Sequence, residues 1–78
     1  MVDGIRGLTT YEAVQAFQRI GYRVERVGGG HIVLEHPTRP PLELPYRAIQ
    51  AVAEGLMLVQ IRTAGCTLEE FLDAQDER

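Results

Sequence analysis

The chain has 78 residues, enough for one domain with a small hydrophobic core. Its net charge is −3 and all 8 basic residues are arginine, so the composition as a whole argues against loose binding to nucleic acid. A single cysteine excludes an internal disulfide, and no apolar run is long enough to cross a membrane. We expect a cytoplasmic protein with one domain over residues 1–78 and loose tails at 1–7 and 74–78.

The charge is unevenly distributed along the chain. Residues 19–47 carry 5 arginines and 3 glutamates, whereas residues 48–78 carry 2 arginines and 6 acidic residues. Because phosphates attract positive charge, a nucleic-acid site is expected in the middle of the chain.

The first part of the chain predicts an amphipathic helix. Apolar side chains recur at helical spacing between residues 11 and 20. Thr9 or Thr10 can cap this helix, with Glu12 in its first turn. Gly21 is a typical residue to end it.

Three strands are predicted to follow, at residues 22–27, 31–36 and 41–45. The glycines at 28–30 predict one hairpin turn, and the proline-rich segment 37–41 predicts the second. Since both connections are short, the strands should lie antiparallel and in sequence order.

The last part of the chain is helical again. The helical pattern runs from Ala48 to Ala64, but Gly55 interrupts it, so the helix can begin there with a separate turn of helix before it. The segment Thr67-Leu68-Glu69-Glu70 has the capping-box pattern and predicts a last short helix. The predicted fold is α+β, in the order α-β-β-β-α-α, with helices on one face of a three-stranded antiparallel sheet. The expected core residues are Phe17, Val24, Ile32, Leu34, Leu44, Ile61 and Phe71.

A glycine–histidine motif lies at the centre of the chain. Gly21-Tyr22-Arg23 precedes Gly29-Gly30-His31, which opens a short apolar strand that ends in His36-Pro37. Leu44-Pro45-Tyr46, Ala64-Gly65 and Glu69-Glu70-Phe71 follow at fitting distances. From about residue 8 to residue 72, this pattern resembles the HicA family of small RNA-cleaving toxins.

The resemblance implies a fold akin to the double-stranded RNA-binding domain. It also implies mRNA cleavage by a single histidine, and neutralisation by a HicB-like antitoxin protein. Under this interpretation His31 is the catalytic residue, and Gly29 and Gly30 form its turn. No cofactor and no metal ion are expected.

The chemistry of RNA cleavage is compatible with these residue types. Histidine can take or give a proton near neutral pH, and arginine can bind a phosphate with its planar guanidinium group. Strand alternation places His31 on the face away from the helices. Arg26, Arg47 and the backbone of Gly29 and Gly30 are the candidate phosphate ligands.

Several carboxylates can share the open face of the sheet. Glu25, Glu35 and Glu43 would either repel RNA there, or pair with Arg23 or orient the imidazole of His31. The sequence leaves these alternatives open.

Other residues favour a second interpretation. Leu58 and Val59 stand where the family often has basic residues, which favours a non-catalytic module of the same fold that binds protein or RNA. With Leu56 they predict an apolar surface for a homodimer or a protein partner, unless Gly55 bends the segment and buries them. His36 is expected to pack at a strand end, and Cys66 to be a buried or idle thiol.

Overall fold

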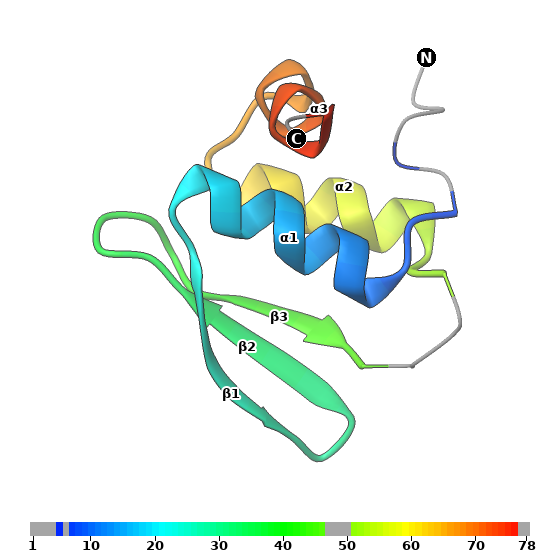
Figure 1. The fold of residues 1–78 in the computed structure, drawn as a ribbon, viewed down its shortest axis with the longest axis vertical. Coiled ribbons are helices and arrows are strands. Elements are labelled where there is room, and N and C mark those ends of the chain that lie inside the picture. Colours follow the sequence, from blue (N-terminus) through cyan, green and yellow to red (C-terminus); the bar gives the residue numbers. More distant parts are fainter. Residues whose placement is uncertain (1–4, 6, 47–50, 77–78) are drawn as a thin grey trace.

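The computed structural model describes residues 5, 7–46 and 51–76. Its elements confirm the predicted α+β order. They are α1 (Thr10–Ile20), β1 (Arg23–Gly28), β2 (His31–Glu35), β3 (Leu42–Pro45), α2 (Glu54–Thr63) and α3 (Leu68–Asp76). The strands form one antiparallel sheet in the order β1-β2-β3. In Figure 1 the three helices lie on the same side of this sheet.

The helix ends follow the predicted capping residues. Thr9, not Thr10, is the N-cap of α1, and it forms a reciprocal capping box with Glu12. Gly21 ends the helix with a φ of 118°, a conformation that favours glycine. The hydroxyl of Thr67 accepts a hydrogen bond from the backbone N–H of Glu70 at 3.0 Å, as predicted for the residue that caps the last helix.

The segment before α2 differs from the prediction. Ala51 forms an isolated antiparallel bridge with Thr9, and the N–H of Val52 donates to the carbonyl of Leu8 at 2.7 Å. Residues 51–53 are therefore outside any helix, and α2 begins at Glu54, next to Gly55. The predicted turn of helix is wrong for these residues, because the backbone pairs with the start of the chain instead. Residues 48–50 lie outside the described residues.

The core lies between the helices and the sheet. Phe17 of α1 is at its centre, with ring centroids 5.7 Å from Tyr22 and 5.0 Å from Phe71. Six of the seven predicted core residues are buried.

The terminal segments also contribute to the packing. Ile5 is fully buried, and the carbonyls of residues 74 and 75 accept hydrogen bonds from Arg19, so the tails expected to be loose are held at these positions.

Val24 is the core prediction that is wrong. It is 40% exposed, and every residue of β1 is exposed. The cause is position in the fold: β1 is an edge strand, and the β1–β2 hairpin extends away from the helices in Figure 1. A register shift between Val24 and Arg26, typical of a β-bulge, accompanies this exposure.

Candidate catalytic histidine and its surroundings

His31 is held at the start of β2 by a tight glycine turn. Gly29 and Gly30 have φ values of 61° and 82°, as the two-residue turn of a β-hairpin with this handedness requires. A Cβ at either position would meet nothing within 4 Å, so the backbone of the turn is open to a ligand. Ile32 and Leu34 are buried on the helix side, which leaves His31 on the open face with its side chain 52% exposed.

A carboxylate of β3 faces the imidazole. The Nδ1 atom of His31 lies 3.7 Å from Oε2 of Glu43. Glu43 is opposite Val33 in the register, so it is a diagonal neighbour of His31 on the open face. Among the described residues no hydrogen bond or ion pair involves Nε2, the other ring nitrogen.

The three glutamates thus have different surroundings. The carboxylate of Glu43 lies 3.7 Å from the imidazole of His31, and that of Glu25 lies 3.8 Å from the guanidinium group of Arg23. Glu35 is opposite Arg23 in the register of β1 and β2. Pairing with Arg23 therefore occurs for Glu25, and Glu43 is the carboxylate that lies beside His31.

The predicted phosphate ligands are only partly described. Arg26 is opposite Val33 and so shares the open face with His31, two residue pairs along the sheet. No hydrogen bond or ion pair joins Arg26 to His31 in the described part of the chain. Arg47 lies outside the described residues. The turn itself is attached to the end of β3, because the carbonyl of Gly30 accepts a hydrogen bond from Tyr46 at 2.8 Å.

The second histidine has a structural role. The N–H of Thr38 donates to Nδ1 of His36 at 3.1 Å, so Nε2 carries the ring hydrogen and can donate to the carbonyl of Ile20 at 3.3 Å. The ring also makes an edge contact with Tyr22, at a centroid distance of 4.9 Å. His36 packs at the strand end, as predicted.

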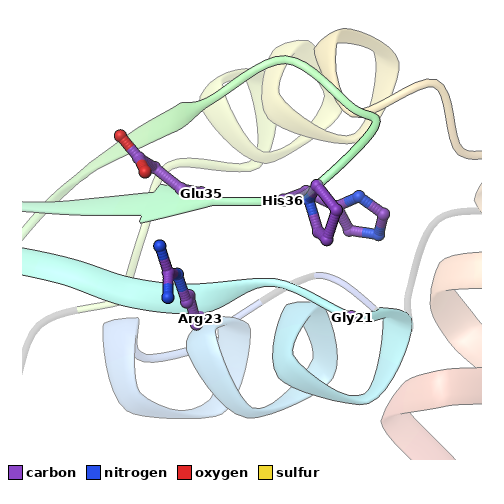
Figure 2. Close-up of a pocket in the computed structure, with 5 residues that line it drawn as sticks. Gly21, Arg23, Glu35 and His36 are labelled. Atoms are coloured by element: carbon purple, nitrogen blue, oxygen red, sulfur yellow. The ribbon is translucent and has the colours of Figure 1, made fainter.

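A hollow of about 440 Å³ lies beside His36, at the opposite end of β2 from His31. Gly21, Arg23, Glu35, His36 and Pro37 line it. Figure 2 shows Arg23 and Glu35 rising from neighbouring strands, with His36 beyond the end of β2. Since both ring nitrogens of His36 are engaged, the hollow does not provide a free base.

The cysteine belongs to a cluster that sequence reasoning missed. Arg39 donates to Sγ of Cys66 at 3.1 Å and lies 3.3 Å from the carboxylate of Glu70. Burial raises the pKa of the Cys66 thiol, and the charge of Glu70 raises it further, while Arg39 opposes the shift. A raised pKa disfavours the nucleophilic thiolate, in accord with an idle thiol. No local pattern marked Arg39, because its partners are distant in the sequence.

Among residues 5, 7–46 and 51–76, no three His, Cys, Asp or Glu side chains converge in a way that could hold a metal ion. No helix in the same residues is long and apolar enough to cross a membrane. The sequence matches no protein-family model and no curated protein.

Proposed function

We propose that the chain is a HicA-like RNA endonuclease that acts on mRNA without a metal ion and uses His31 as its catalytic residue. The observation that supports this proposal best is the environment of His31. Its imidazole is exposed beside an open glycine turn, with Nδ1 facing the Glu43 carboxylate. We expect Glu43 to accept a hydrogen bond from Nδ1 when RNA is bound, which leaves Nε2 to transfer the proton.

The proposed reaction begins at the RNA 2′-hydroxyl. Nε2 of His31 accepts its proton, and the 2′-oxygen attacks the adjacent phosphorus while the bond to the 5′-oxygen breaks. The imidazolium, stabilised by Glu43, then donates its proton to the departing 5′-oxygen. The products are a 2′,3′-cyclic phosphate and a free 5′-hydroxyl. Arg26 and the backbone N–H groups of Gly29 and Gly30 would bind the phosphate as negative charge develops.

The proposal also covers the fold type, the location in the cell and the partner protein that the resemblance implies. The fold would be of the double-stranded RNA-binding type, the protein would act in the cytoplasm, and a HicB-like antitoxin would neutralise it. The order α-β-β-β-α, with helices on one sheet face and the histidine on the other, supports this assignment.

A specific observation favours a second candidate, a non-catalytic binding module of the same fold. Leu58 and Val59 are exposed on α2, so Gly55 does not bury them. An apolar helix surface where the family often has basic residues suits a protein partner better than a phosphate backbone.

Purified wild type and the variant His31→Ala, incubated with RNA in the presence of EDTA, separate the two functions. We expect wild type to cleave and His31→Ala to lose cleavage with a nearly unchanged melting temperature, because the side chain is half exposed. His36→Ala is the matched control: it should keep cleavage below its melting temperature, but melt earlier because it loses the contacts to Ile20 and Tyr22.

The conditions of the assay test the mechanism further. Cleavage should slow at acid pH, as general-base catalysis requires, and RNA binding should weaken with salt. Cleavage that persists in purified His31→Ala, or that requires a divalent metal, contradicts the mechanism. A wild type that does not cleave RNA supports the binding module instead.

A further inference from the structure

The outer edge of β1 is unpaired. The strand order places β1 and β3 at the two edges of the sheet. β3 contains Pro45 and follows two other prolines, which discourage strand pairing, whereas β1 contains none. In the part of the chain that the structure describes, no segment pairs with the outer edge of β1. An exposed edge without proline is a template for another strand.

The two faces of β1 differ in chemistry. Val24 and Val27 are opposite Leu34 and Ile32, so both valines lie on the helix side of the sheet, where they are 40% and 55% exposed. Arg26 is opposite Val33 and lies on the open face. Arg23 is opposite Glu35 and is also on the open face. Glu25 lies on that face too, because its carboxylate is 3.8 Å from the guanidinium group of Arg23. The bulge produces this arrangement: it places two valines that are three residues apart on one face.

We propose that β1 pairs antiparallel with β1 of a second copy of this chain, about a two-fold axis between Glu25 and Arg26. In this register Val24 is opposite Val27 of the second copy, and Glu25 is opposite Arg26 of the second copy. The symmetry makes each pair occur twice. All four valines meet on the helix side, and all four charges alternate in sign on the open face.

Neighbouring registers are unfavourable. A shift by one residue in one direction places Glu25 opposite Glu25 of the second copy, and Val24 opposite a charged residue that points to the other face. A shift in the other direction places Arg26 opposite Arg26. Without the bulge, the favoured register would itself pair side chains from opposite faces. The bulge and the sequence RVERVG therefore select the same register.

The paired sheet would have six strands, with both sets of helices on one face and both His31 side chains on the other. Every residue of β1 is exposed and none of the described helices covers the strand, so the second copy has access to its edge. Arg26 can still bind phosphate, because a guanidinium group has five N–H donors and one carboxylate does not occupy them all.

Sedimentation analysis over a concentration series tests the proposal with charge variants. We expect wild type to form a dimer. Glu25→Arg and Arg26→Glu should each weaken it about tenfold, because each places like charges opposite one another twice. The double variant Glu25→Arg/Arg26→Glu should restore the dimer. The matched control is Glu35→Arg, on the same face but outside the pairing, and it should leave the dimer unchanged.

A cross-linking measurement covers the case in which a charge variant does not fold. In a Cys66→Ser background, Val24→Cys mixed with Val27→Cys should form a disulfide between copies under mild oxidation, faster than either variant alone. A wild type that stays monomeric at the highest concentrations overturns the proposal. So does a dimer that neither charge variant weakens, or a mixture that gives no preferential cross-link.

Discussion

Phe17 is the side chain on which the packing of α1, the start of β1 and α3 depends. It is fully buried, and its ring contacts those of Tyr22 and Phe71 at centroid distances of 5.7 and 5.0 Å. Truncation of a fully buried phenylalanine to alanine costs about 3–5 kcal/mol, from lost burial and the cavity that remains. A domain of this length has about 4–12 kcal/mol of stability in total. Phe17→Ala should therefore leave the domain barely stable or unfolded.

Equilibrium unfolding in urea, followed by circular dichroism, measures this loss. With a slope of about 1 kcal/mol per molar urea, the midpoint of Phe17→Ala should fall by about 3 M or more. Phe17→Leu is the matched control: it keeps most of the volume and should cost less than about 1.5 kcal/mol. A midpoint for Phe17→Ala within about 0.5 M of wild type would refute this account of the core.

Three further predictions concern stability. Gly21→Ala should cost about 1–3 kcal/mol and more than Gly65→Ala, because only at Gly21 would the new Cβ meet a side chain, 2.7 Å from Nε2 of His36; equal losses in urea would contradict this. Thr10→Val should cost about 1–3 kcal/mol, since the buried hydroxyl donates to the carbonyl of Pro45 at 2.7 Å; Thr10→Ser should retain most of that stability. The raised pKa of Cys66 means that the folded state keeps its proton when the unfolded state has lost it, so stability should fall above about pH 8.5. Urea unfolding of Cys66→Ser should show a smaller alkaline decline than wild type.

The sequence predicted those parts of the fold that local chemistry controls. Capping by a threonine at position 9 or 10 and by Thr67, the stop at Gly21 and a hairpin within the glycines at 28–30 each depend on residues within a few positions of one another. The exposure of Val24 depends on where the helices end above the sheet, which no local pattern encodes. Alternation therefore predicted its face correctly and its burial wrongly.

The residues of the candidate site were likewise predicted only in part. Strand alternation was enough to place His31 on the open face, because the faces of β2 follow from its own apolar residues. The partner of the imidazole could not be chosen, because three glutamates share that face and only the register of β2 and β3 brings Glu43 diagonal to His31. The contacts of Arg39 with Cys66 and Glu70 were missed for the same reason: they join segments about 30 residues apart.

The hairpin of β1 and β2 carries the proposed RNA site and the proposed dimer edge on residues that contribute little to the core. Its exposed residues, including His31, Arg26 and Val27, make few contacts with the helices, whereas the residues on the inner face of β2 are buried in the core. Substitutions on the exposed surface of the hairpin should therefore alter RNA cleavage or self-association with little change in the melting temperature of the monomer, measured at concentrations too low for a dimer. Substitutions at Phe17 or Leu34 should do the reverse, because any loss of function there follows unfolding. In a domain with so small a core, the proposed sites are compatible with folding because their residues contribute little to it.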